Sequence, residues 1–300
     1  MTQTSPGINK AYDWCQQLAK SHYENFPVAS VLLPGHLRRP IAAIYAFART
    51  ADDFADEGDL PQAERLARLN KYSALLRDIE TAEYRGQEPV FIALQDAVHR
   101  YSLPVQLLED LLIAFRQDVV KSRYVSFEEV LDYCRYSANP VGRLLLHLDG
   151  SPNQIQLVQS DAVCTALQLI NFYQDIEQDY REQNRVYIPL DEMTTAGLTE
   201  HDLIQPDSRK VAPLIRSLHQ RAITLMSQGY PLGMTLSGRL GWEVRAMTLG
   251  GMTTLKLLQR QTDFALLSRP RLSRWQLVNI LILSTHKNGY QRAVKRLLNN

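Results

Sequence analysis

Two stretches of the chain carry carboxylates at helical spacing. The first contains Tyr45, Arg49, Asp52 and Asp56 at successive offsets of four, three and four residues, so a helix would place all four side chains on one face. Asp53 lies beside them, and the flanking residues are mainly alanine, isoleucine and phenylalanine. A helix that is apolar on most sides is usually buried. We call Asp52, Asp53 and Asp56 the first acid row.

The second stretch has the same arrangement. Gln168, Asn171, Asp175 and Asp179 follow at offsets of three, four and four residues, with large apolar residues between them. Asn171, Asp175 and Asp179 form what we call the second acid row. Arg185 follows and can pair with one of these acids but not with all of them, so the row needs a further positive partner.

The two acid rows predict a metal site. If they face each other across a cavity, the carboxylates repel one another unless cations bridge them. Oxygen-only ligands favour a hard cation, and Mg²⁺ usually keeps waters and completes its shell with substrate phosphate oxygens. A single acid pair of this spacing is ordinarily a solvated surface. Two pairs, each embedded in apolar residues and each with an arginine nearby, favour several Mg²⁺ ions bound together with substrate phosphate.

Composition limits the class of protein. The chain has 300 residues, 45% of them hydrophobic, and a formal net charge of +1, so no nucleic-acid partner is expected. Its three cysteines are widely spaced and form no metal-ligand pattern, which favours a reducing compartment. We find no signal-peptide pattern and no apolar run of membrane-spanning length. We therefore expect a cytoplasmic protein, either free or associated with a membrane surface.

Helical patterns dominate, and no run of alternating β-branched residues is present, so the predicted fold class is all-α. Asn139 precedes Pro140, which should break the chain there; Asn139 then either contacts a ligand or caps an ordinary turn. Helices are expected over approximately 8–23, 38–58, 61–84, from 89, from 104, from 127, and over 153–183, 210–228, 237–262 and 273–298.

The last expected helix is basic. This set of cations is either a solvated face or a contact for an anionic membrane surface. The basic residues of this segment are Arg274, Lys287, Arg292, Lys295 and Arg296.

The acid-bearing stretches resemble the two signatures of the squalene, phytoene and dehydrosqualene synthases, which couple prenyl diphosphates head to head. The first is YAFARTADDFADE, residues 45–57, and the second is QLINFYQDIEQDYREQNRVYIP, residues 168–189. The resemblance extends from about residue 12 to the C-terminus. It implies that residues 1–300 form a single helical bundle of the isoprenoid synthase type around a central cavity.

Within this family the chain is most similar to the bacterial hydroxysqualene synthases of the hopanoid route. HYENFPVASVLLP (22–34), YCRYSANPVGRLLLHL (133–148) and NFYQDIEQD (171–179) carry that similarity. Two positions depart from the commoner pattern: Glu24 stands where a diphosphate-binding lysine is frequent, and Gln174 where an arginine is frequent. The loss of two positive groups fits a substrate with one diphosphate, such as presqualene diphosphate.

The resemblance implies an enzyme, a carbon–oxygen lyase that ionises presqualene diphosphate with Mg²⁺ and captures water to give hydroxysqualene. One alternative is a prenyltransferase that couples two farnesyl or geranylgeranyl diphosphates to presqualene diphosphate, squalene or phytoene. Another is a non-catalytic isoprenoid-binding or assembly factor. The expected partners are the prenyl diphosphate, a functionally coupled presqualene diphosphate synthase and a peripheral membrane contact. NADPH is not expected, although it would be required if hydride quenched the cation.

The candidate site residues fall into three groups. The metal ligands are expected to be Asp52, Asp53, Asp56, Asn171, Asp175 and Asp179. Catalytic roles are expected for Tyr45, Arg49, Tyr133, Gln168, Arg185 and Tyr187. Substrate contacts are expected for His22, Phe26, Asn139 and Phe172.

Overall fold

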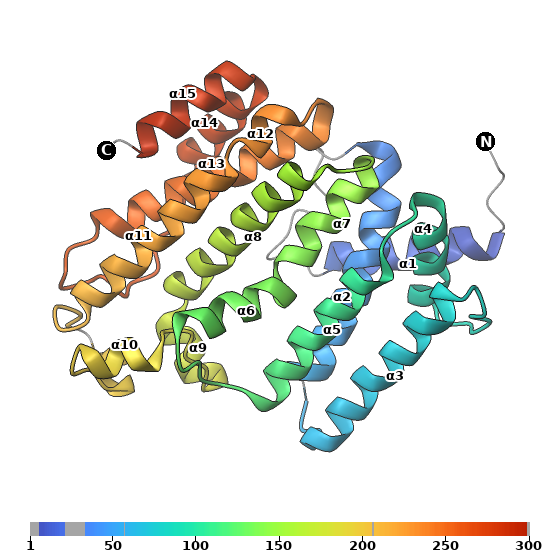
Figure 1. Cartoon of the computed structure of the whole chain (residues 1–300), viewed down its shortest axis with the longest axis horizontal. Coiled ribbons are helices and arrows are strands. Elements are labelled where there is room, and N and C mark those ends of the chain that lie inside the picture. Colours follow the sequence, from blue (N-terminus) through green and yellow to red (C-terminus); the bar gives the residue numbers. More distant parts are fainter. Residues whose placement is uncertain (1–5, 22–33, 57, 206, 299–300) are drawn as a thin grey trace. The chain divides into compact units, whose positions relative to one another are not determined.

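The computed structural model describes residues 6–21, 34–56, 58–205 and 207–298. These residues form α-helices and short 3₁₀ turns (Figure 1), which confirms the predicted all-α class. Within the described ranges the one β-type pairing is an isolated parallel bridge between Arg123 and Val186. The chain divides into two compact units, 1–120 with 140–153 and 121–139 with 154–300.

The first unit is organised around α2, which contacts α1, α3, α4 and α5. Ala43, Ala46, Phe47 and Ala51 of α2 are fully buried. The three alanines let the neighbouring helices approach closely. The elements of this unit are α1 (Pro6–Ser21), η1 (Gly35–Leu37), α2 (Arg38–Asp56), α3 (Gln62–Glu80), α4 (Pro89–Tyr101), α5 (Val105–Val120) and α7 (Asn139–Asp149), whose first residue belongs to the second unit.

The second unit is built on α8, which contacts α6, α11 and α13 and runs beside α11 and α13 in Figure 1. None of the described helices is both long and apolar enough to cross a membrane. The elements of this unit are α6 (Phe127–Ser137), α8 (Gln154–Gln174), α9 (Ile176–Gln183), α10 (Leu190–Thr195), η2 (Glu200–Ile204), α11 (Ala212–Gly229), α12 (Leu232–Thr235), α13 (Gly238–Arg260), α14 (Arg274–Thr285) and α15 (Lys287–Leu298).

The expectation of one helix over 273–298 is wrong. The chain is extended at His286, with φ −117° and ψ 136°, and α15 starts at the next residue. The buried guanidinium of Arg245 donates to the Ser284 carbonyl at 2.6 Å and to the Thr285 carbonyl at 3.4 Å. These carbonyls therefore find partners outside the helix, which allows α14 to end there.

The expectation of one continuous helix over 153–183 is also wrong, because α8 ends at Gln174 and α9 begins at Ile176. Asp175 lies between them with φ −110° and ψ 13°. The break is slight: the Asp175 amide still donates to the Asn171 carbonyl at 3.0 Å. The predicted break before Pro140 is confirmed, since α6 ends at Ser137 and α7 begins at Asn139.

Candidate active site

The first acid row lies on the last two turns of α2, at the register predicted from its spacing. Arg49 pairs with two acids of the same helix: its Nη1 lies 3.2 Å from Asp52 Oδ2 and its Nη2 lies 2.6 Å from Asp53 Oδ1. All three side chains are partly exposed. Arg49 thus holds two carboxylates at neighbouring positions, and Asp56 follows at the exposed end of the helix.

Tyr45 lies one turn before Arg49 on the same helix. Burial raises the pKa of the Tyr45 phenol, and the nearby Arg49 lowers it only in part. The phenol is therefore protonated at neutral pH and is able to donate a hydrogen bond to an anionic oxygen.

Arg65, which sequence analysis missed, clamps the end of α2. Its guanidinium donates to the carbonyls of Ala55 and Gly58 at 2.5 Å, and to that of Leu60 at 3.0 Å. The last carbonyls of a helix have no partner within the helix, so a cation there satisfies them and interacts favourably with the helix dipole. Arg65 thereby fixes the turn that carries the first acid row.

Replacing Arg65 with alanine is expected to lower the free energy of unfolding by about 1–3 kcal/mol, because partly buried carbonyls at the end of α2 lose charge-assisted hydrogen bonds. Urea denaturation measures this change. Arg68→Ala is the control, since Arg68 is exposed, pairs with Glu64 on its own helix and donates to none of these carbonyls, although its guanidinium lies 5.6 Å from the centre of the Phe54 ring. Equal destabilisation by both variants would contradict the clamp.

The second acid row spans the break between α8 and α9. Asp175 and Asp179 remain on consecutive turns, because the Asp179 amide donates to the Asp175 carbonyl at 2.7 Å. Both acids are half-buried, whereas Asn171 is exposed. The break therefore preserves the predicted spacing of the two carboxylates.

Arg269 supplies a cation that sequence analysis did not find. Its Nε lies 2.9 Å from Asp175 Oδ1, and its Nη1 donates to Gln178 Oε1 at 3.2 Å. The neighbouring Pro270 carbonyl accepts a hydrogen bond from Gln174 Nε2 at 3.3 Å. The segment between α13 and α14 thus contacts the second acid row from a distant part of the sequence.

The second acid row is incompletely neutralised. Burial, followed by the negative charge of Asp175, raises the pKa of Asp179 to about 7, and Arg185 and Arg269 offset this only in part. Burial also raises the pKa of Asp175, against the opposing effect of Arg269. Two half-buried acids with raised pKa values are suited to binding a cation.

Four aromatic rings gather beside this row. The rings of Phe172 and Tyr187 stack with centroids 3.6 Å apart and an interplanar angle of 6°. Tyr133 lies 6.1 Å from Phe172 and 5.7 Å from Tyr187, and Tyr124 lies 5.5 Å from Tyr133. The cluster thus joins three predicted site residues, and Tyr124 is an addition that sequence analysis missed.

A small cavity of about 10 Å³ connects the aromatic cluster with the acid row. Phe172, Asp179, Arg185 and Tyr187 are among its lining residues. The structure therefore brings together an acid, an arginine and two rings that the sequence places on α8, on α9 and in the loop after it.

Arg123, also missed, holds that loop. Its Nε and Nη2 donate to the two Glu200 carboxylate oxygens at 2.6 and 2.7 Å, and Nη2 also donates to Asn184 Oδ1 at 2.8 Å. Asn184 has a positive φ of 51° at the end of α9. Arg123 thus fixes the turn immediately before Arg185.

The other predicted residues have different outcomes. Asn139 Oδ1 accepts a hydrogen bond from Thr165 at 2.9 Å, so the side chain ties the start of α7 to α8. Gln168 is half-buried on α8. His22 and Phe26 lie outside the described residues. The catalytic role of Gln168 and the substrate contacts of Asn139, His22 and Phe26 stay predictions.

The donor set fits Mg²⁺ in one particular way. Within the described part of the chain, no three His, Cys, Asp or Glu side chains converge to form a metal cage. Each row instead presents oxygen donors on successive helical turns. Mg²⁺ is commonly bound by one or two carboxylates, with waters and substrate phosphate oxygens completing its shell. The rows therefore fit a metal that arrives with a diphosphate.

Comparison with known proteins places the chain in a family. The family model for squalene/phytoene synthase matches residues 19–276. The chain therefore belongs to the squalene/phytoene synthase family.

Within this family, the chain is similar to hydroxysqualene synthases and to a squalene synthase of known structure. Hydroxysqualene synthase of Rhodopseudomonas palustris is 38% identical over 79% of this chain and 80% of its own length. Hydroxysqualene synthase of Zymomonas mobilis is 43% identical over 60% of this chain and 59% of its own length. The crystal structure of squalene synthase HpnC from Alicyclobacillus acidocaldarius aligns with a TM-score of 0.80 and 35% identity, covering 87% of this chain and 97% of that one.

Proposed function

We propose that this protein is a Mg²⁺-dependent carbon–oxygen lyase that ionises presqualene diphosphate and adds water to give hydroxysqualene. The observation that carries the proposal is the second acid row, with its two raised carboxyl pKa values beside an aromatic cluster. The identity of 38–43% to hydroxysqualene synthases supports it. In the reaction the C–O bond breaks, its electron pair leaves with the diphosphate, and a water oxygen bonds to the carbocation as a proton is lost.

The chain's own side chains have three tasks in this reaction. Each acid row would hold Mg²⁺ through its carboxylate oxygens, and the metal, when bound, would supply positive charge to the leaving diphosphate. Tyr45 and Tyr187 donate hydrogen bonds to the departing oxygens, and Arg49 and Arg185 add positive charge there. The faces of Tyr133, Phe172 and Tyr187 stabilise the carbocation and exclude all but the reacting water.

Head-to-head coupling of two farnesyl diphosphates is the second candidate function, because the family includes enzymes named for squalene and phytoene formation. Arg269 beside Asp175 restores one of the two positive charges that Glu24 and Gln174 remove. One restored charge still favours a single diphosphate. A separate enzyme that joins two C15 diphosphates must then supply the substrate, so we infer functional coupling to it.

Product analysis by mass spectrometry separates the candidates. With presqualene diphosphate and Mg²⁺ in ¹⁸O-labelled water, we expect hydroxysqualene carrying one ¹⁸O atom and no requirement for NADPH. Presqualene diphosphate or phytoene formed from farnesyl or geranylgeranyl diphosphate alone would instead identify a coupling enzyme. Binding of presqualene diphosphate without turnover would indicate the non-catalytic alternative.

We also propose a peripheral membrane contact, because the substrate and the product are long hydrocarbons. The face of α14 that carries Trp275, Val278 and Ile282 is exposed, and the Trp275 side chain is 83% accessible. Aromatic and aliphatic residues near cations are typical of interfacial helices. Cosedimentation with anionic vesicles tests this contact, and protein that stays in the supernatant would refute it.

A further inference from the structure

The three C-terminal helices of the second unit enclose a groove that the proposed reaction does not use. Its volume is about 480 Å³, and it lies between α13, α14 and α15. Its apolar lining is formed by Leu249, Leu257, Ile280, Leu283, Ala293 and Leu297. The groove is therefore large enough for part of a hydrocarbon chain.

Two pairs of cations line the same groove. Lys256 and Arg260 are four residues apart on α13, and Arg292 and Arg296 are four residues apart on α15. No acidic residue is among the described residues that line it. An adjoining hollow of about 770 Å³ is lined by Lys256, Arg260 and Arg296 together with Arg216. The two spaces thus share three positive side chains.

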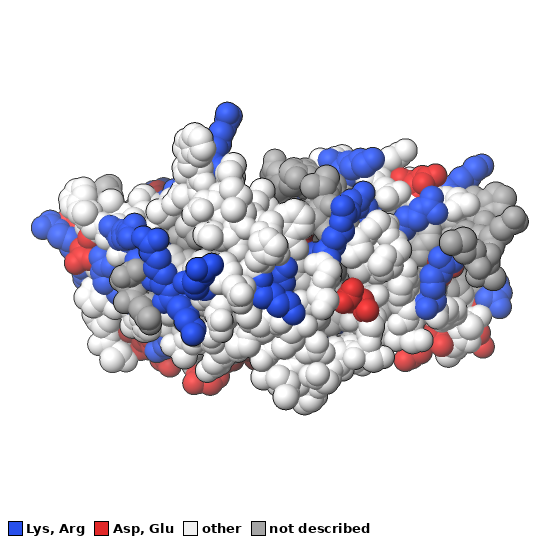
Figure 2. All heavy atoms as spheres, turned by 90° about the horizontal axis from the view of Figure 1, so that it is seen from above, with Lys and Arg blue, Asp and Glu red and all other residues white. Residues whose placement is uncertain are grey.

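This charge is concentrated in one part of the chain. Residues 264–300 contain seven lysines and arginines and no aspartate or glutamate, whereas the whole chain has a formal net charge of +1. Figure 2 shows Lys and Arg side chains gathered over the C-terminal helices, on the left of the view. Like charges four residues apart on a helix are destabilising. Two such pairs on one groove make its lining positively charged, which favours an anionic ligand.

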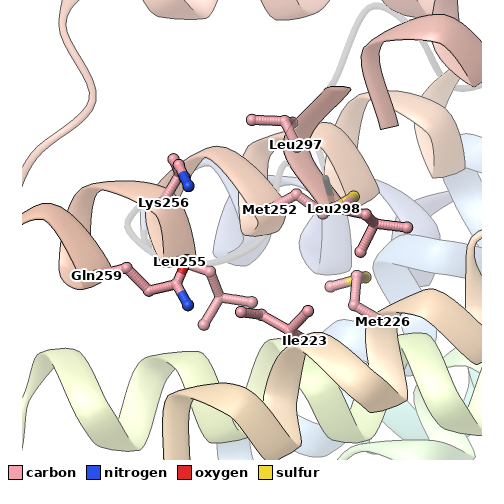
Figure 3. A pocket seen from close by; sticks show the side chains of 8 residues that line it. All are labelled: Ile223, Met226, Met252, Leu255, Lys256, Gln259, Leu297 and Leu298. Carbon is pink, nitrogen blue, oxygen red and sulfur yellow. The ribbon is translucent and has the colours of Figure 1, made fainter. Parts of the chain in front are cut away.

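The chemistry of the lining identifies the anion. Guanidinium groups bind phosphate through paired hydrogen bonds, and a lysine adds a point charge. A small apolar hollow of about 10 Å³ borders the groove at Lys256 and Leu297, and Met226, Met252 and Leu255 line it further in (Figure 3). Phosphate-binding groups and apolar surface thus occur side by side.

We propose that this groove binds the phosphate or diphosphate head group of an amphiphile whose hydrocarbon chain lies on the apolar lining. The site is separate from the acid rows, and its cations bind the head group directly, without a metal. Binding there neither requires nor implies turnover of presqualene diphosphate. The ligand is either a membrane phospholipid or a free prenyl diphosphate, because both present this chemistry.

Calorimetry on the full-length protein in EDTA tests the proposal. The probes are inorganic diphosphate and monomeric dihexanoyl-phosphatidic acid, and EDTA prevents metal-dependent binding at the acid rows. The groove variant is Arg292→Gln with Arg296→Gln. The matched control is Lys287→Gln with Lys295→Gln, which removes the same charge from the same helix at positions that do not line the groove. Thermal denaturation checks that both variants fold.

We expect the groove variant to bind dihexanoyl-phosphatidic acid about 30-fold more weakly and the control to change by less than about threefold. A parallel loss of binding to phosphatidylglycerol vesicles would identify a membrane lipid as the source. Unchanged vesicle binding would identify a free phosphorylated ligand. Equal losses in both variants, no binding of either probe, or no tighter binding of the lipid than of inorganic diphosphate would overturn the proposal.

Discussion

Replacing Asp175 with asparagine is expected to lower the rate of diphosphate release from presqualene diphosphate by about a hundred- to a thousandfold. The substitution keeps the size of the side chain but removes the negative charge that we propose as a Mg²⁺ ligand. Removing one group that stabilises the developing anion has effects of this size in other enzymes. Phosphate-release kinetics in a coupled pyrophosphatase assay measure the rate.

Glu177→Gln is the matched control for this substitution. The substitution removes the same charge at a position two residues after Asp175. Glu177, however, is exposed and pairs with Arg181 on its own helix. A loss of activity in the control equal to that of Asp175→Asn would show that general charge, not the acid row, matters. Asp52→Asn tests the first row in the same assay.

The local part of the site was predictable from the sequence. Offsets of three and four residues correctly placed Tyr45, Arg49 and Asp52 along α2, because the helical repeat fixes which side chains share a face. Apolar neighbours also indicated the partial burial of Asp175 and Asp179, which the structure confirms. These successes depend only on residues less than two helical turns apart.

The residues that position the acid rows were not predictable in this way. Arg65 acts on carbonyls about ten residues earlier, Arg123 acts on Asn184, and Arg269 acts on Asp175. The sequence spacing between each of these arginines and its partner does not follow the helical repeat. Only the folded chain brings each arginine to its partner, so helical periodicity does not predict these contacts.

The break between α14 and α15 also depends on a contact between residues far apart in the sequence. Nothing in the segment around Ser284 excludes a continuous helix as strongly as a proline would. The break at His286 depends on Arg245, which lies about forty residues earlier and takes the carbonyls of Ser284 and Thr285. Two separate helices, α14 and α15, are what allow a groove that both cations and apolar residues line.

Arg269 changes how the departure at Gln174 is interpreted. The sequence alone indicates that a positive group is missing beside the second acid row. In the folded chain the Gln174 amide instead binds the Pro270 carbonyl, and the adjacent Arg269 reaches Asp175. The positive charge is thus supplied from a different segment, so glutamine at position 174 does not by itself leave this row without a cation.

The Mg²⁺ concentration that gives half the maximal rate is expected to rise as the pH falls below 7. The pKa of Asp179 is raised to about 7, chiefly by burial and then by Asp175. Below that pH the folded protein holds a proton on Asp179, and a metal ion must displace it. The apparent affinity for Mg²⁺ should therefore fall by about fiftyfold between pH 7 and pH 5, approaching tenfold per pH unit at the lower end.

Initial rates measured over a range of Mg²⁺ concentrations at each pH test this expectation. Saturating Mg²⁺ should remove most of the pH dependence, whereas a loss of rate that excess Mg²⁺ leaves unchanged would contradict it. Protonation of His219 does not explain a pH dependence in this range, because burial lowers its pKa to about 4 and the side chain stays neutral.

Protonation of Asp179 has the opposite effect on the stability of the metal-free protein. Since the folded pKa of Asp179 exceeds the unfolded one, lowering the pH from 7 towards 4 should stabilise this part of the fold while it weakens metal binding.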